Sequence, residues 1–250
     1  MAKHRSTLLI LLTLLAGAPA FAEGLTDRAT DRVREGIKRY TGGQVTVDRV
    51  SPTPIAGLFE VVSGLDVFYA DATGRYALVD GRLVDTEQKR DLTQSTLETL
   101  SRIDFKSLPL NLAIKTVTGT GKRQLAIFED PTCPACQSLH GALGQLKDVT
   151  LYTFAYPIIS EKAIPAAIAT LCAPAATRAA KWNGYMQGAP LPETLDAKCD
   201  RAQADLQTIL ALGERYGIRN TPTLFLGNGK RIMGGIPPEQ LAAALDELGQ

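Results

Sequence analysis

Two cysteines lie three residues apart at the point where an apolar run gives way to a helical pattern. Cys133 and Cys136 follow the strand-like run 125–128. A thiol at the start of a helix lies near unpaired backbone N–H groups and the positive end of the helix dipole, which favour the thiolate. A second thiol three residues further on lies one turn away on the same face. The spacing predicts a redox pair in which Cys133 attacks a disulfide and Cys136 resolves the mixed disulfide.

A zinc knuckle and a structural bridge are the alternatives for this cysteine pair. A structural zinc site usually needs four ligands, and the sequence has no second Cys-x-x-Cys. Attachment of a c-type haem requires a histidine directly after the motif, where Gln137 stands. These observations favour the redox interpretation, with no metal or cofactor.

The composition is that of a folded chain without a nucleic-acid surface. Of the 250 residues, 45% are hydrophobic and 21% are charged, which leaves room for one large domain or two small ones. The 27 basic residues nearly balance the 26 acidic ones. We therefore expect no nucleic-acid partner, which would require a clustered basic surplus.

The first 22 residues have the pattern of a cleavable secretory signal. Lys3 and Arg5 precede the apolar stretch 8–16, and residues 20–22 form a small-x-small cleavage site. A membrane anchor is the alternative, but the apolar region 7–22 is shorter than the roughly 20 residues of a spanning helix. All four cysteines lie beyond this segment, which favours an oxidising compartment such as a bacterial periplasm.

The part of the chain that precedes the cysteine pair has an α+β pattern. Residues 23–85 begin with an amphipathic helix over 25–40 and continue with short strands and turns. Such a small domain has a marginal core, so we expect it to pair with a second copy; packing against the rest of the same chain is the alternative. Residues 86–106 predict a mostly solvated linker helix, or else an ordinary surface helix of a single domain.

The C-terminal part, residues 107–250, alternates strands and helices around the cysteine motif. A hairpin is predicted at Asn228-Gly229. Strands are predicted at 112–117, 124–128, 149–154, 223–226 and 231–233, and helices directly after the motif, over 160–187, over 192–216 and from 237 onward.

This order of elements resembles the thioredoxin fold, and the whole mature chain resembles the periplasmic disulfide isomerases of the DsbC type. The resemblance rests on residues 128–136, on residues 217–223 and on the pair Cys172 and Cys199. It implies a small N-terminal α+β dimerisation domain, a linker helix and a C-terminal thioredoxin-like domain with a helical insertion.

The resemblance also implies roles for two further pairs of residues. Pro222 would be cis and would face the cysteines, with the Thr221 backbone free to pair with an extended substrate; an ordinary edge-strand start is the alternative. Cys172 and Cys199 would form a structural disulfide that closes the insertion. A second redox pair is the alternative, but neither cysteine has a helix-start position in the sequence pattern.

The sequence departs from the thioredoxin pattern at the position six residues before Cys133. Thioredoxin and its oxidising relatives have a buried acid there, and this chain has Ile127. We interpret Glu129 and Asp130 as loop acids or helix-start charges. His140, the only histidine of the mature chain, is interpreted as a surface or partly buried helix residue. The core of the insertion is expected to include Trp182, Tyr185 and Met186.

These features together predict a protein disulfide isomerase. Its expected partners are misoxidised or unfolded exported proteins, a membrane reductant of the DsbD type and a second copy of the chain. A DsbG-type reductase that protects single thiols from oxidation to sulfenic acid is the nearest alternative. A chaperone-type binding protein, with incidental cysteines, is the alternative from another class.

Overall fold

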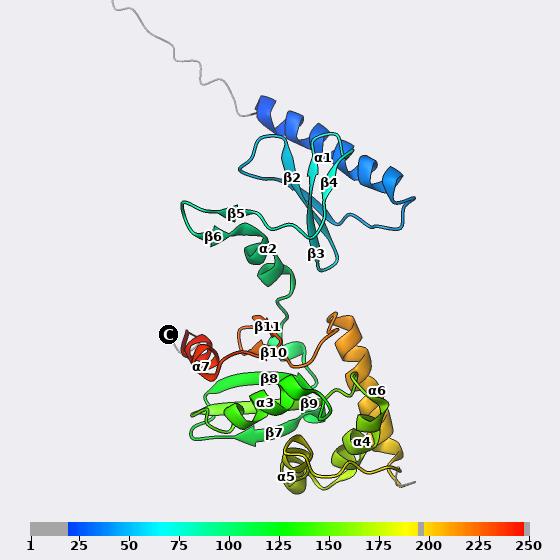
Figure 1. The fold of residues 1–250 in the computed structure, drawn as a ribbon, viewed down its shortest axis with the longest axis vertical. Helices are drawn as coiled ribbons and strands as arrows, with labels where there is room; N and C mark the ends of the chain where they lie inside the picture. Colours follow the sequence, from blue (N-terminus) through cyan, green and yellow to red (C-terminus); the bar gives the residue numbers. More distant parts are fainter. Residues whose placement is uncertain (1–19, 195–197, 248–250) are drawn as a thin grey trace, which may run out of the picture. The chain divides into compact units, whose positions relative to one another are not determined.

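A computed structural model describes residues 20–194 and 198–247, which form two compact units divided between Leu83 and Val84 (Figure 1). The predicted signal peptide, residues 1–22, lies outside the described residues, apart from its last three residues. The domain limits expected from the sequence stay a prediction. No helix in the described ranges is long and apolar enough to cross a membrane.

The first unit is one helix packed on an antiparallel sheet with strand order β1-β2-β3-β4. Helix α1 (Ala20–Tyr40) turns Val33 and Ile37 toward Val61 of the sheet. The helix approaches the turn after β3 so closely that a Cβ on Gly36 would lie 2.6 Å from the Gly74 carbonyl oxygen. Tyr40, expected on the apolar face, is 86% exposed. The strands are β1 (Arg49–Pro52), β2 (Leu58–Ser63), β3 (Asp66–Asp71) and β4 (Ala77–Leu78).

The predicted linker helix is shorter than expected. A hairpin of β5 (Val84–Asp85) and β6 (Arg90–Asp91) occupies its first residues, with Lys89 at a positive φ of 52° in the turn. Helix α2 (Leu92–Leu100) begins only after Asp91, whose side chain accepts a hydrogen bond from the Gln94 N–H. Most of α2 is not buried, as its thin apolar stripe predicted.

The second unit contains a five-stranded sheet with strand order β11-β10-β8-β9-β7. Strands β8 and β9 are parallel, and the other neighbours are antiparallel. The strands are β7 (Ile114–Val117), β8 (Arg123–Glu129), β9 (Val149–Ala155), β10 (Thr223–Leu226) and β11 (Arg231–Met233). The helices are α3 (Pro134–Leu143), α4 (Ile164–Cys172), α5 (Ala175–Met186), α6 (Asp200–Arg215) and α7 (Pro238–Asp246), with short 3-10 turns at Phe105–Ser107, Leu110–Leu112 and Glu161–Ala163.

Alternation along the central strand β8 divides the core of this unit into two layers. Leu125 and Ile127 pack with side chains of α3 and α7 on one face of the sheet. Ala126 and Phe128 belong to the cluster on the other face, which includes side chains of α4 and α6. Helices therefore cover both faces of this mixed sheet, as the predicted fold class requires.

The two long helical stretches predicted after β9 are interrupted. The first breaks at Pro174, which lies between α4 and α5 and cannot continue the hydrogen-bond ladder of α4. The second helical stretch was expected to begin near residue 192. It begins at Asp200, directly after Cys199.

Candidate active site

Cys133 and Cys136 lie where β8 ends and α3 begins. Cys133 is the N-cap residue of α3, with extended backbone angles, and Pro134 is the first helical residue, where the missing N–H costs no helical hydrogen bond. Both thiols are free, Cys133 is 6% exposed and Cys136 is fully buried. The thiol of Cys133 is thus the only one of the two that a large substrate reaches from solvent.

Asp130 holds the loop that carries Cys133. Its carboxylate is fully buried and accepts hydrogen bonds from the Thr132 N–H at 2.7 Å, the Thr132 hydroxyl at 2.6 Å and the Ile159 N–H at 2.9 Å. Its carbonyl accepts a bond from the Cys133 N–H at 3.1 Å. Asp130 is therefore a loop acid, as expected, and its role in the structure is to fix the backbone before α3.

The Thr221–Pro222 peptide bond is cis and lies against the cysteines. The Cys133 thiol donates to the Thr221 carbonyl at 3.3 Å, and the Pro222 carbonyl accepts from the Gly234 N–H at 2.8 Å. Within the described residues the buried Thr221 hydroxyl has no hydrogen-bond partner other than the Cys136 sulfur, for which it is a donor when that thiol is ionised. Segments 88 residues apart in sequence thus form the two walls of the site.

Burial strongly raises the pKa of the Cys136 thiol. The Asp130 backbone N–H and the Thr221 hydroxyl, which favour the thiolate, offset this effect only in part, and the neighbouring Cys133 adds to the rise. Cys136 is therefore a protonated thiol at neutral pH.

Glu129 is neither a loop acid nor a helix-start charge, so that interpretation is wrong. It is the last residue of β8 and is fully buried. Its carboxylate accepts from the Trp182 indole N–H at 2.7 Å and lies 3.2 Å from Nδ1 of His140. Strand alternation places Glu129 on the same face as Ile127, a signal that the sequence already contained.

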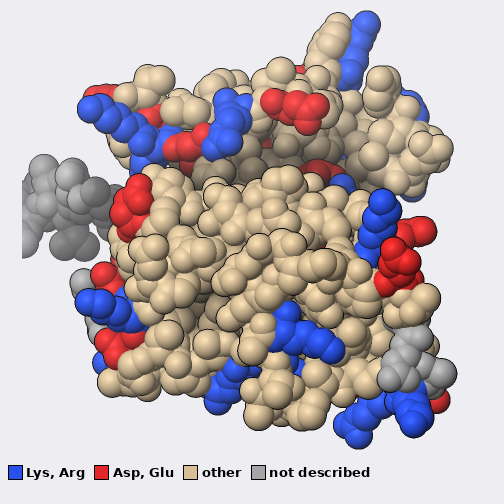
Figure 2. Space-filling view, turned by 60° about the horizontal axis from the view of Figure 1, so that its bottom comes forward, with Lys and Arg blue, Asp and Glu red and all other residues tan. Residues whose placement is uncertain are grey.

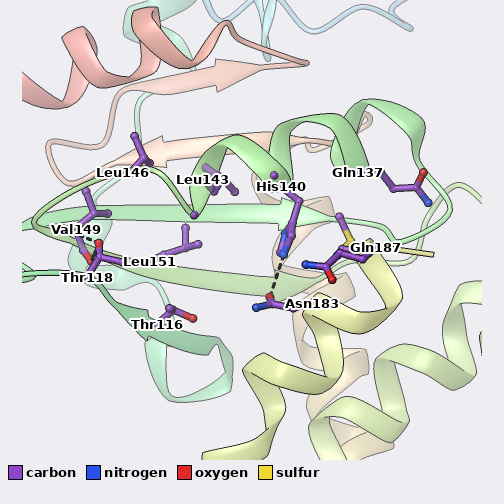
Figure 3. A pocket seen from close by; sticks show the side chains of 13 residues that line it. Thr116, Thr118, Gln137, His140, Leu143, Leu146, Val149, Leu151, Asn183 and Gln187 are labelled. Atoms are coloured by element: carbon purple, nitrogen blue, oxygen red, sulfur yellow. Dashed lines mark hydrogen bonds between the residues drawn. The ribbon is translucent and has the colours of Figure 1, made fainter. Parts of the chain in front are cut away.

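His140 joins the active-site helix to the helical insertion. Its Nε2 lies 2.9 Å from the Asn183 side-chain oxygen, and Figure 3 draws this hydrogen bond as a dashed line. Its Nδ1 faces Glu129. Burial lowers the pKa of His140, but the hydrogen bond and charge of Glu129 outweigh burial, with help from Asn183, so that its pKa lies above 6.5. It is partly buried, as expected. Trp182 and Met186 lie in the core, and Tyr185 packs at its edge.

Cys172 and Cys199 are joined by a disulfide with an S–S distance of 2.03 Å. Cys172 is the last residue of α4, so the bond ties together the two ends of the segment that contains α5. Cys199 is the N-cap residue of α6, so the expectation that neither cysteine has a helix-start position is wrong for Cys199. Among the described residues, neither Cys172 nor Cys199 forms a hydrogen bond with Cys133 or Cys136.

Comparison with known proteins gives the family of the chain. Residues 22–94 match the disulfide bond isomerase protein N-terminal domain, and residues 110–249 match the thioredoxin-like domain. The chain is 41% identical over 221 residues to the probable thiol:disulfide interchange protein DsbC of Bordetella avium, covering 88% of this chain and 76% of that protein. The chain belongs to the DsbC family of thiol:disulfide interchange proteins. The resemblance drawn from the sequence is thereby confirmed.

Two further relatives agree with this membership of the DsbC family. The chain is 25% identical to the thiol:disulfide interchange protein DsbC of Escherichia coli K12, over 95% of this chain and 94% of that protein. It is also similar to the crystal structure of the disulfide interchange protein from Neisseria gonorrhoeae, with 34% identity and a TM-score of 0.50. That match covers 57% of this chain and 99% of the other.

Proposed function

We propose that this protein is a periplasmic disulfide isomerase in which Cys133 is the attacking thiol and Cys136 the resolving one. The observation that carries the proposal is the placement of the free Cys133 thiol at the start of α3, 3.3 Å from the Thr221 carbonyl and beside the buried Cys136. A client cysteine would meet this thiol between the helix start and the cis peptide.

The first step joins the client to Cys133. The Cys133 thiolate attacks one sulfur of a wrong disulfide, the client S–S bond breaks, and the other client sulfur leaves as a thiolate. The Thr221 backbone, which lies against Cys133, is suited to pair with an extended client chain in the manner of an added strand.

Two fates of the mixed disulfide distinguish isomerisation from reduction. If another client thiolate attacks the client sulfur bound to Cys133, a new client disulfide forms and Cys133 is released as a thiolate. If Cys136 attacks the Cys133 sulfur, the client is reduced and a Cys133–Cys136 disulfide remains. Because burial raises the pKa of Cys136, its thiolate is scarce, which leaves time for the client to rearrange. The Thr221 hydroxyl is a donor for that thiolate when it forms.

The second fate consumes two electrons, so the cycle requires a reductant that converts the Cys133–Cys136 disulfide back to two thiols. A membrane protein of the DsbD type is the proposed source. A homodimer formed through the N-terminal unit would present two such sites to one client.

Two variants test the cysteine roles on a scrambled multi-disulfide protein. Cys133→Ala is expected to abolish recovery of the native disulfides. Cys136→Ala is expected to retain part of that recovery and to accumulate mixed disulfides with the client, detected by mass spectrometry. Full recovery by Cys133→Ala would contradict the proposal, and retention of aggregation suppression alone would favour the chaperone alternative. Protection of a single-thiol protein from sulfenic acid, without recovery of native disulfides, would favour the reductase alternative.

A further inference from the structure

A groove of about 400 Å³ lies in the second unit between α3, α5 and the β9–β7 edge of the sheet (Figure 3). Its apolar lining consists of Leu143, Leu146, Val149, Leu151 and Met186. Side-chain amides of Gln137, Asn183 and Gln187 line it as well. Apart from the imidazole of His140, which is paired with Glu129, no lining residue carries an ionisable side chain. The groove is thus suited to an uncharged, largely apolar ligand.

Figure 2 turns the lower end of Figure 1 forward, where α5 and β7 lie, and shows a broad area of uncharged residues with Lys and Arg side chains within and around it. The residues that line the groove itself include no Asp, Glu, Lys or Arg. An apolar segment would therefore bind there without burying one of these charges, which would be costly.

Gly141 keeps the groove open. It is an interior residue of α3, where glycine costs about 1 kcal/mol of helix stability relative to alanine. Its φ is not positive, and a Cβ added there would meet nothing within 4 Å, so neither the backbone nor close packing requires glycine. Gly141 lines the groove, and because it has no side chain, the space along this wall of the groove stays free.

The groove begins next to the cysteine pair. Gln137 directly follows Cys136, and its side-chain amide donates to the Pro131 carbonyl in the loop before Cys133 at 2.7 Å. His140, further along the groove, follows Cys133 by seven residues, about 10 Å of helical rise. An extended chain attached at Cys133 spans that distance in about three to five residues.

We infer that this groove binds an apolar side chain of the client polypeptide, about three to five residues from the client cysteine that is joined to Cys133. The apolar floor takes the side chain. The Gln187 amide, the Gln137 side-chain oxygen and the Asn183 side-chain N–H groups, which are not used in the bonds to Pro131 and His140, bind the client main chain. The inference rests on the proposed function, because the client reaches the groove while it is held at Cys133. The protein should therefore prefer clients that expose an apolar residue near the cysteine of an incorrect disulfide.

Peptides with one cysteine test this inference in the full-length protein. In a Cys136→Ser background, the Cys133 thiolate attacks the peptide sulfur of a peptide–glutathione disulfide, and glutathione leaves as a thiolate. The equilibrium constant of this exchange is measured by mass spectrometry for Gly/Ser peptides that carry a leucine about four or about ten residues from the cysteine, and for the peptide without leucine.

Leucine at the shorter spacing is expected to raise the exchange constant about tenfold, as partial burial of one apolar side chain would, and leucine at the longer spacing should have no effect. Gly141→Trp fills the groove and should remove the tenfold gain, and Gly141→Leu should reduce it. Gln145→Trp, at an exposed residue that does not line the groove, should keep the gain. Circular dichroism establishes that each variant is folded.

Three results would overturn the inference. The first is a gain that does not depend on spacing, and the second is a gain that persists in both Gly141 variants. The third is a change of oligomeric mass in Gly141→Trp, which would assign the groove to a second copy of the chain. Absence of any mixed disulfide with any peptide would instead contradict the proposed function, and the inference with it.

Discussion

The buried carboxylate of Glu129 lies between a neutral partner and an ionisable one. The Trp182 indole supplies a neutral donor at 2.7 Å, whereas His140 at 3.2 Å is the partner that gains a charge when it binds a proton. Since the pKa of His140 is raised, the folded state binds this proton more tightly than the unfolded chain. The pair therefore makes stability depend on pH near neutrality.

Replacement of Glu129 by glutamine should lower the pKa of His140 and weaken the fold most at acidic pH. The stabilisation from the raised pKa is fully present below 6.5, the ordinary value for histidine, and is lost as the pH rises through the folded value. We expect Glu129→Gln to reduce the free energy of unfolding by about 1–3 kcal/mol at pH near 6, and by less above the folded pKa. Urea denaturation over this pH range measures the difference, and NMR titration of His140 measures the pKa.

His140→Gln provides the matched control for that experiment. In this background, Glu129→Gln should lose its pH dependence, because no imidazole remains to bind the proton. An unchanged His140 pKa in Glu129→Gln would contradict the assignment of the shift to Glu129.

At the scale of elements, local signals in the sequence located most of the second unit. The strands predicted at 124–128 and 149–154 are β8 and β9 within about a residue, because buried strands read as continuous apolar runs. The helix start at Cys133 followed from the change of an apolar run into a helical pattern, and Pro134 at the first helical position fits it.

Other elements and contacts depend on tertiary structure and could not be predicted from local pattern. The hairpin of β5 and β6 replaces a helical start because its turn uses Lys89 at a positive φ, which lysine rarely adopts. The neighbours of Glu129 come from α3 and α5, which no spacing in the sequence relates. The groove beside α3 is likewise formed by segments that only the fold brings together.

The disulfide between Cys172 and Cys199 should stabilise the second unit without taking part in exchange. Closing a loop between residues 27 apart restricts the unfolded chain by roughly 3.5 kcal/mol in the entropic description. We expect the double variant Cys172→Ala/Cys199→Ala to lose about 2–4 kcal/mol of unfolding free energy, measured by chemical denaturation.

The activity of the same double variant separates a structural role from a redox role. Below its unfolding temperature it should recover native disulfides in a scrambled client as the parent protein does, since Cys133 and Cys136 are retained. Loss of that activity in a folded variant would favour a second redox pair. Cys136→Ala, which removes a cysteine of the proposed site, is the control that should change the products of exchange.

At the scale of the whole molecule, the first unit has a small core and an apolar sheet edge. Among the side chains that the structure describes, its buried cluster has seven residues, fewer than either cluster of the second unit. Tyr76, Leu78 and Val79, at or beside the edge strand β4, are 64%, 56% and 66% exposed. An edge strand with exposed apolar side chains is suited to pairing with another strand, which supports the proposed homodimer.

Leu78→Lys should therefore dissociate the proposed dimer. A lysine at this edge would place an unpaired ammonium in the interface, so the dissociation constant should rise at least about tenfold, as measured by sedimentation. Ile55→Lys, at a residue 51% exposed elsewhere in the same unit, should leave the mass unchanged. A parent protein that is monomeric at all concentrations tested would contradict the homodimer.

Trp182 is the single tryptophan of the chain, and it lies in the second unit with its indole hydrogen-bonded to Glu129. Intrinsic tryptophan fluorescence therefore reports on one unit only, whereas far-ultraviolet circular dichroism sums over the helices of both. If the units unfold separately, the two optical signals will give different midpoints in the same denaturant titration. Such a mismatch would measure the independence of the two units and would not indicate an intermediate inside either one.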